Sequence, residues 1–384
     1  MLESIYNITL LDHPLKGYKT IYNLLSQKSI CIKNEIRIPT DLPIEYQQRM
    51  VQMNMLVSSK ADDICNALSL YNEFANLDML SLTVLLTGKC NCRCIYCYEA
   101  GCAIPETADA DSVADKILSE MNRLNLSKLF ISFFGGEPLL NKKALHKIAS
   151  KMHICLGEKF SFAIVTNGTL LSPKDIDTWN HLGLESIKVT LDGNKEIHNL
   201  RRIYKSGLGT CDDIMTNLEQ ISGRTKLVIN VVLDGTVQNI SNMISDVERR
   251  KIVAEFDLSL CDPFNGSNQE KRSLLLRFSQ ELKDHHLTQH SVISHPHGAI
   301  CMMKQQKSFA IAGDFVYGCV GNLNHPINKN LILTKNTNTT ISEVCMECTY
   351  LPICFGGCIY TRKCEFDLYH TLIPDILRIY IGSK

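Results

Sequence analysis

Hydrophobic positions follow two different periods in the first 80 residues of the chain. Apolar residues that alternate with polar ones predict short strands over residues 6–11, 18–25 and 29–36. Apolar residues spaced three or four apart then predict helices over residues 44–57 and 61–75. Residues 1–80 are therefore predicted to form a small α+β unit that is accessory to the rest of the chain.

From Ser81 onward, apolar runs alternate with amphipathic helical stretches. The six runs span residues 82–86, 128–134, 160–165, 186–191, 226–233 and 253–260. Strand–helix alternation of this kind makes parallel βαβ units. The pattern predicts an α/β fold in which residues 81–290 wrap into a partial (β/α)6 barrel of the TIM type. Turn sequences follow the first four runs, and binding sites on parallel sheets form at those carboxyl ends of the strands.

The periodicity fades after about Ser291, where cysteines become frequent in a segment rich in glycine, asparagine and threonine. Residues 291–384 are predicted to be a third, cysteine-rich unit that bound metal holds together. A chain of 384 residues is long enough for two or three units with separate cores.

Charge and hydropathy exclude several classes of partner. The chain has 40 basic and 40 acidic residues, so no general field attracts nucleic acid or an anionic membrane. It contains no apolar run of about 18 residues that would span a bilayer, and its first residues lack the pattern of a secretory signal. We therefore expect a cytoplasmic protein that binds neither nucleic acid nor membrane.

Cysteine changes the picture, because 17 cysteines in a reducing compartment favour metal binding over a disulfide framework. Cys90, Cys94 and Cys97 follow the first barrel strand, with three and two residues between them. Three thiolates on a short loop can bind three irons of a [4Fe–4S] cluster and leave the fourth iron open to a non-protein ligand. A structural zinc site would require four protein ligands, usually in paired Cys-x2-Cys units. The spacing therefore favours the iron–sulfur cluster.

The sequence CNCRCIYCYE, residues 90–99, resembles the signature loop of the radical S-adenosylmethionine (SAM) superfamily, including the aromatic Tyr96. Other motifs of that family follow in order. GGEP at 135–138 resembles the segment that holds the methionyl amino group, and TNG at 166–168 lies where the ribose and carboxylate of SAM are contacted. Residues 191–202 resemble the LDG…HDxxR segment, with one departure: Asn199 stands where the family usually has Asp.

This resemblance implies a set of functional residues. The implied ligands of the SAM-binding [4Fe–4S] cluster are Cys90, Cys94 and Cys97. The residues implied to contact SAM are Tyr96, Gly135, Gly136, Glu137, Thr166, Asn167, Asp192 and Arg202. Glu137 suits the ammonium group of SAM, and Arg202 suits its carboxylate. Cys92 and Cys102 are not expected to bind metal.

A second group of cysteines lies near the end of the chain: Cys301, Cys319, Cys345, Cys348, Cys354, Cys358 and Cys364. Their spacing resembles the SPASM extension of radical SAM enzymes, which binds one or two auxiliary [4Fe–4S] clusters. The ligation of that family implies an outer cluster on Cys345, Cys348, Cys354 and Cys364, and an inner cluster on Cys301, Cys319 and Cys358. The Cys-x2-Cys unit alone would also fit a zinc ribbon.

The inner cluster would have three evident thiolates. Its fourth iron is then open, or takes another ligand such as Cys211 or Cys261. An open iron would be able to bind a substrate thiolate. Cys211 and Cys261 have no partner at ligand spacing, so packing in the core is their alternative role.

The resemblance to SPASM enzymes also implies a function. Such an enzyme cleaves SAM reductively to a 5′-deoxyadenosyl radical, which abstracts hydrogen from a peptide substrate and leads to a thioether or other crosslink. The N-terminal unit resembles the leader region of SPASM enzymes that modify ribosomally made peptides (RiPP maturases). The expected partners are a precursor peptide and an electron donor such as ferredoxin or flavodoxin.

Other functions stay open on the sequence. Sulfatase-type formylglycine maturation and peptide epimerisation are related possibilities, although Val320 stands where the sulfatase-maturing family has an Asp directly after the cysteine equivalent to Cys319. A non-catalytic zinc-binding interaction protein belongs to a different class. Iron with acid-labile sulfide would separate the enzyme from the zinc protein.

Overall fold

The computed structural model describes residues 1–75, 78–107, 109–234, 240–260, 266–287, 301–302, 304–305, 307–333, 341–358 and 364–381. Its centre is a sheet in which six strands lie side by side in chain order, all parallel. The six are β6 (Met79–Leu85), β8 (Lys128–Phe134), β9 (Phe160–Thr166), β10 (Leu184–Thr190), β12 (Lys226–Leu233) and β13 (Glu255–Leu260). This arrangement confirms the predicted α/β fold, in which six parallel strands form a partial barrel.

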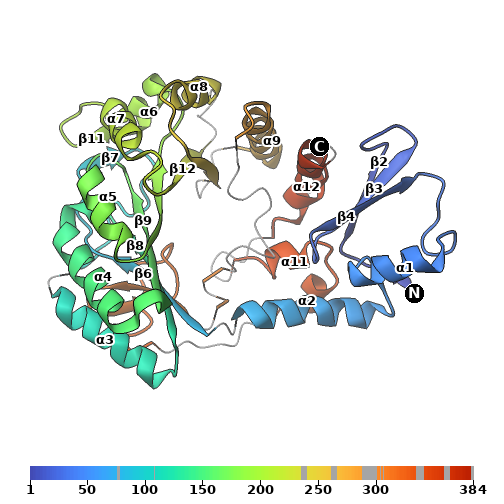
Figure 1. Cartoon of the computed structure of the whole chain (residues 1–384), viewed down its shortest axis with the longest axis horizontal. Coiled ribbons are helices and arrows are strands. Elements are labelled where there is room, and N and C mark those ends of the chain that lie inside the picture. Colours follow the sequence, from blue (N-terminus) through green and yellow to red (C-terminus); the bar gives the residue numbers. More distant parts are fainter. Residues whose placement is uncertain are drawn as a thin grey trace.

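Helices cover the outer face of this sheet (Figure 1). They are α3 (Ala110–Arg123), α4 (Lys142–Leu156), α5 (Pro173–Asn180), α7 (Cys211–Ile221) and α8 (Ser241–Arg249). Alternate residues of β8 and β9 are buried, so each strand turns one row of apolar side chains toward the helices.

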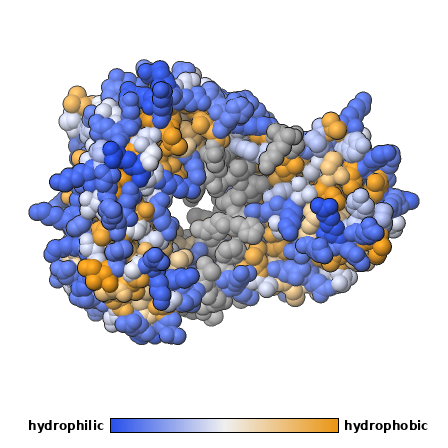
Figure 2. Space-filling model, in the orientation of Figure 1, coloured by the Kyte–Doolittle hydropathy of each residue, from blue (hydrophilic) through white to orange (hydrophobic). Residues whose placement is uncertain are grey.

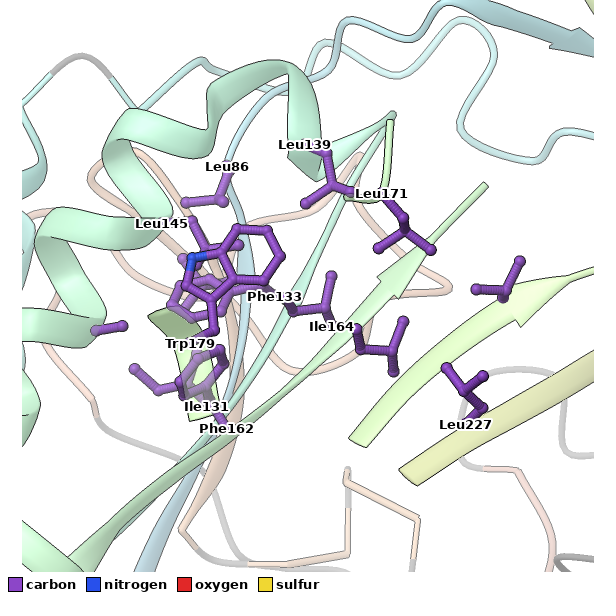
Figure 3. Close-up of a cluster of buried hydrophobic side chains, with 14 of the residues drawn as sticks. Leu86, Ile131, Phe133, Leu139, Leu145, Phe162, Ile164, Leu171, Trp179 and Leu227 are labelled. Carbon is purple, nitrogen blue, oxygen red and sulfur yellow. The ribbon is translucent and has the colours of Figure 1, made fainter. Parts of the chain in front are cut away.

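The helices and the sheet share one large core. Figure 3 shows Trp179 of α5 above Phe133 and Phe162. The rings of the two phenylalanines meet edge to face, with their centroids 5.5 Å apart. Each of these three side chains is at most 2% exposed. Burying a large apolar side chain contributes about 1.5–3 kcal/mol to stability, so this core fixes the ends of the parallel strands firmly.

Two further strands extend the sheet beyond the predicted six. β14 (Ser308–Ala312) pairs in parallel with β6, and β15 (Phe315–Tyr317) pairs antiparallel with β14. The hydrophobic pattern predicts no strand after residue 260. All five residues of β14 are buried, so the strand lacks the alternation that identifies a half-buried strand from sequence.

The N-terminal unit has the predicted order of strands and helices. β2 (Asn7–Leu11), β3 (Tyr18–Asn23) and β4 (Lys28–Lys33) form an antiparallel sheet, followed by α1 (Ile44–Gln52) and α2 (Lys60–Ala75). The helix predicted over residues 44–57 is five residues shorter, because Asn54 has a φ of 55° and the next segment, β5 (Leu56–Val57), pairs with β1 (Leu2–Glu3).

The end of the chain completes the core of the N-terminal unit. α12 (Phe366–Tyr380) packs against both α9 (Asn268–Asp284) and β2, and Figure 1 shows it between them. The shared core consists of Tyr6, Ile8, Leu10, Leu24, Leu25, Ala67, Tyr350, Leu351, Ile353, Phe355, Ile373 and Leu377. The expectation that regular structure fades after residue 291 is wrong for α12, whose pattern is interrupted by Pro374 inside the helix.

In the space-filling view, the barrel lies on the left and the N-terminal unit on the right (Figure 2). Within the described part of the chain, no helix is both long enough and apolar enough to cross a membrane.

Candidate functional site

The loop that carries the first three predicted cysteine ligands follows β6. Its middle forms β7 (Cys92–Cys94), which lies side by side with β11 (Arg202–Tyr204), so that Cys94 is directly opposite Arg202. The backbone N–H of Ile95 also donates to the carbonyl of Arg201 at 3.0 Å. The cysteine loop is therefore attached by backbone hydrogen bonds to the segment with the two arginines, although about a hundred residues separate them in the chain.

The thiols on this loop differ in their surroundings. Hydrogen bonds from the Cys92 side chain, its backbone N–H and Asn167 together lower the pKa of Cys90 to about 6 against the cost of burial. Burial raises the pKa of Cys94 to about 11, although Arg202 opposes the shift. Burial also raises the pKa of Cys97. The surroundings of Cys90 thus favour the thiolate, which is the form that binds iron.

A tight turn of two glycines packs against the start of the cysteine loop. Gly135 and Gly136 follow β8 with φ angles of +90° and +48°, respectively. A Cβ atom on Gly136 would lie 2.3 Å from the carbonyl oxygen of Lys89. The backbone N–H of Glu137 donates to that same oxygen at 2.9 Å. Only glycine permits this close approach of the turn to the loop.

The Glu137 side chain is fully buried beneath the turn. Oε1 accepts hydrogen bonds from the Leu139 N–H at 2.9 Å and the Thr166 hydroxyl at 2.7 Å, and Oε2 accepts one from the Asn167 N–H at 2.8 Å. Burial raises the pKa of Glu137 to about 7, and these three donors oppose that shift. The carboxylate joins the ends of β8 and β9, and both of its oxygens already have partners within the protein.

Asp192 occupies the same level at the end of β10. Its buried carboxylate accepts hydrogen bonds from the Tyr96 hydroxyl, from Arg201 Nε at 3.3 Å and from the Val232 N–H at 3.0 Å. Arg201 also pairs with Asp234 at 2.6 Å. This network holds together the cysteine loop, the end of β10 and the end of β12.

Arg202 is different from its neighbour in the chain. The Arg202 guanidinium is buried, and Tyr96 is its one hydrogen-bond partner among the described residues, at 2.7 Å. Burial alone would lower the pKa of Arg202. The neighbouring Tyr96, Cys94 and Asp192 side chains have a larger, opposite effect, so the pKa of Arg202 is raised overall. A guanidinium has five N–H donors, so most of its donors remain available to an anion.

His198 and Asn199 fix the segment that leads to Arg202. The Asp192 N–H donates to Nδ1 of His198, so Nε2 carries the proton and donates to the Thr210 hydroxyl at 2.9 Å. Thr210 in turn donates to the Arg202 carbonyl at 2.7 Å. The side-chain oxygen of Asn199 accepts from the N–H groups of residues 210 and 211, where α7 begins. Asn199 therefore has the same acceptor that an Asp would provide at this position.

Comparison with known families identifies this part of the chain. Residues 84–245 match the family model described as Radical SAM superfamily. This segment is a radical SAM domain. It contains the cysteine loop, the GlyGly turn, Asp192 and both arginines.

Curated relatives of the radical SAM domain match over part of their length. One is Molybdenum cofactor biosynthesis protein 1 of Dictyostelium discoideum, 38% identical over 118 residues, which are 29% of this chain and 17% of the relative. Another is GTP 3',8-cyclase of Clostridium acetobutylicum, 32% identical over 162 residues, which are 40% of this chain and 48% of the relative. The chain thus spans less than half the length of these two relatives.

Solved structures resemble a larger part of the chain. Native anSMEcpe with bound AdoMet and Kp18Cys peptide has a TM-score of 0.62 at 19% identity, and the likeness covers 78% of this chain and 96% of that one. Streptococcus suis SuiB bound to precursor peptide SuiA has a TM-score of 0.56 at 13% identity, covering 94% and 95%, respectively. At such identities the likeness shows a shared fold.

The match of residues 84–245 to the radical SAM family implies a [4Fe–4S] cluster and SAM. Groups of this chain fit both. Three thiols lie on one loop, the Arg202 guanidinium has a single partner, and the buried Oε1 of Glu99 has none among the described residues. No three His, Cys, Asp or Glu side chains in the described ranges already form a finished metal site, so the ligand assignment stays a prediction.

The C-terminal cysteines lie on short elements packed against the shared core. Cys345 is in α10 (Glu343–Met346) and Cys354 ends α11 (Leu351–Cys354), and Cys345 and Cys348 both touch the core formed with the N-terminal unit. Cys319, Cys345, Cys348 and Cys354 are half-buried, and Cys301, Cys358 and Cys364 are exposed.

Buried Lys304 lies among these cysteines. Its ammonium group donates to the carbonyl oxygens of Cys354 (3.3 Å) and Phe355. A Cβ atom on Gly356 would lie 3.8 Å from Lys304 Nζ and 3.9 Å from Cys345 Sγ, so both atoms border the same small space. This lysine could not be predicted from the sequence, because a single lysine in an irregular segment matches no motif.

The two additional ligands considered for the inner cluster have different outcomes. Cys211 is buried in α7 in the core of the barrel, and Asp212, Lys195, Asp246 and Arg250 are its charged neighbours. This position gives Cys211 a packing role and excludes it as a ligand beside the C-terminal cysteines. Cys261 lies outside the described residues.

Proposed function

We propose that this protein is a radical SAM enzyme that modifies a peptide and carries auxiliary iron–sulfur clusters in its C-terminal unit. The observation that supports it most is the pairing of β7 with β11, because it brings a three-cysteine loop and a buried, largely unpartnered arginine to one place inside a radical SAM domain. When bound, the reduced cluster and SAM supply a 5′-deoxyadenosyl radical that abstracts hydrogen from the substrate.

The residues of the chain have distinct tasks in this proposal. The thiolates of Cys90, Cys94 and Cys97 hold the cluster, and Arg202 faces the carboxylate of SAM. The turn at Gly135 and Gly136 lets backbone groups approach the ligand. The assigned positioning residues are Tyr96, Glu137, Thr166, Asn167 and Asp192. Their hydrogen bonds to one another keep the strand ends in register around the cofactor.

A peptide substrate is supported by the fold and by the N-terminal sheet. Both structural neighbours are complexes with peptides. In this chain, β4 pairs with β3 along one side, and its other side meets no strand within the described ranges. The edge of such a sheet can bind an extended peptide as an added strand. We assign peptide recognition to residues 1–80, radical chemistry to residues 81–290 and auxiliary clusters to residues 291–384.

The predicted auxiliary ligands are Cys345, Cys348, Cys354 and Cys364 for the outer cluster, and Cys301, Cys319 and Cys358 for the inner one. Hydrophobic packing brings part of this segment to the cysteine loop, because Met302 and Val320 share a small cluster with Cys102 and Ile104. An auxiliary cluster held by these cysteines would be able to accept an electron from the substrate radical or to bind the sulfur of the substrate. A small protein such as ferredoxin or flavodoxin would donate the electron that starts the cycle.

Metal analysis of anaerobically purified protein tests the enzyme assignment first. Iron with acid-labile sulfide is expected, and zinc without iron would support the interaction protein instead. The reduced enzyme with SAM is then incubated with a candidate precursor peptide encoded beside this gene. A crosslink removes two hydrogens from the peptide mass, whereas an epimer leaves the mass unchanged. Loss of two hydrogens together with an aldehyde that reacts with hydroxylamine would indicate formylglycine.

A further inference from the structure

Two glutamates meet the GlyGly turn, and their side chains differ in one respect. Glu137 lies beneath the turn, where three protein donors occupy its two oxygens. Glu99 lies on the cysteine loop, two residues after Cys97, and its Oε2 accepts a hydrogen bond from the Gly136 N–H at 2.7 Å. Its Oε1 is buried and has no hydrogen-bond partner among the described residues.

A buried carboxylate oxygen without a donor is uncommon in folded proteins, since the lost hydration is not replaced. Where such an atom lies within a predicted binding site, a ligand can supply the missing donor. Glu99 is held at the turn that the family resemblance assigns to the methionyl amino group, on the same loop as Cys90. The free oxygen therefore belongs to the site already described.

A second incomplete group lies on β11, which pairs with the cysteine loop. Arg202 is paired in register with Cys94 on the neighbouring strand, and its guanidinium uses Tyr96 as its one hydrogen-bond partner in the described ranges. An available cation and an available anion thus both adjoin the cysteine loop. A free α-amino acid group, with one ammonium and one carboxylate, is complementary to that arrangement.

We infer that Glu99, rather than Glu137, is the carboxylate that binds the ammonium group of SAM. This inference rests on the proposed SAM binding and changes the role of one residue within it. Glu137 then positions the turn and the end of β9, and Glu99 and Arg202 bind the two charged ends of the methionyl group.

The test measures ligand affinity in the reconstituted, anaerobic protein by calorimetry. Glu99→Gln keeps the shape of the side chain and removes its charge. SAM is expected to bind about ten to a hundred times more weakly to this variant, as for the loss of a charge-assisted hydrogen bond. An analogue in which a keto group replaces the amino group of SAM is expected to bind equally to both proteins.

Matched variants separate this role from a structural one. Glu106→Gln changes an exposed glutamate that pairs with Lys89 at 2.7 Å, and it is expected to bind SAM as the unchanged protein does. Glu99→Asp keeps the charge and is expected to lose less affinity than Glu99→Gln. The iron content and the EPR spectrum of the reduced cluster without SAM are expected to be the same in all variants.

Several results would overturn the inference. They are unchanged SAM affinity in Glu99→Gln, an equal loss of affinity for the keto analogue, or a loss of iron in Glu99→Gln and Glu99→Asp alike. If the unchanged protein assembles its cluster but binds no SAM, the proposed function itself fails. That outcome is distinct from a change confined to Glu99.

Discussion

The cysteine loop of the radical SAM domain and the C-terminal cysteine segment carry similar thiols on different supports. The loop is held at the ends of parallel strands by paired side chains, such as Asp192 with Arg201 and Glu137 with Thr166. In the C-terminal segment, Cys345 and Cys354 lie on helices of four residues that pack on apolar side chains from the far end of the chain. The first site is positioned by one sheet, whereas the second depends on contacts between distant segments.

The strongest way to separate the two regions is to remove their cysteines in turn. Changing Cys90, Cys94 and Cys97 to Ala is expected to remove about four irons per chain and to abolish SAM cleavage. Changing Cys345 and Cys348 to Ala is expected to remove iron but to leave SAM cleavage to 5′-deoxyadenosine detectable. Iron analysis and chromatography of the nucleoside products measure both effects. Loss of SAM cleavage in both variants would show that the two sites do not act separately.

The two adjacent arginines test how rigidly the first site is built. Arg201→Gln breaks buried ion pairs with Asp192 and Asp234, and is expected to lower the free energy of unfolding by about 3–5 kcal/mol. Arg202→Gln removes a guanidinium that has one partner in the described ranges, and is expected to reduce SAM affinity with little loss of stability. Urea unfolding and calorimetry measure the two effects. Equal destabilisation by both changes would contradict this division.

His198 connects the same site to pH. Burial, with Arg202 and Arg201 nearby, lowers the pKa of His198 from 6.5 to about 3. The unfolded chain therefore binds a proton that the folded chain excludes, and stability falls as pH decreases from 6.5 toward 3. At pH 5 this histidine is expected to cost about 2 kcal/mol relative to pH 7.5.

Urea unfolding of His198→Gln at both pH values measures this contribution, because glutamine does not titrate. The exposed His146 provides a control, since His146→Gln is expected to keep the full pH dependence. An identical pH dependence in His198→Gln and the unchanged protein would show that His198 is protonated to the same extent in both states.

The smallest expected effect concerns Lys304 in the C-terminal segment. Lys304→Met leaves two carbonyl oxygens, those of Cys354 and Phe355, without their donor. The free energy of unfolding is expected to fall by about 1 kcal/mol, the usual net value of a hydrogen bond. Lys304→Arg keeps donors at this place and is expected to lose less. If both variants match the unchanged protein, the lysine does not stabilise this segment.

The features that could be predicted from the sequence are those that a local pattern of residues determines. The six parallel strands have long apolar runs, and the cysteine loop and the GlyGly turn have fixed spacings, so both were found without the structure. β7 and β11 have three residues each, which is too short for a periodic signal. Their pairing is visible only in three dimensions.

Neighbouring residues of the same type show a second limit. Arg201 and Arg202 are adjacent, and Glu99 and Glu137 are both glutamates near expected motifs. A sequence does not show which member of each pair has its hydrogen-bonding groups already occupied by other residues of the protein. The structure shows that Arg201 and Glu137 have several protein partners, whereas Arg202 has one and Oε1 of Glu99 has none in the described ranges.

The shared core has a consequence for biosynthesis. Tyr6 and Leu10 leave the ribosome long before Ile373 and Leu377, which belong to the same core. Until α12 has been made, the nascent chain exposes one apolar face of its first sheet to water and to chaperones. The N-terminal sheet is translated before α12 and is thus expected to reach its final packing only after α12 has been made.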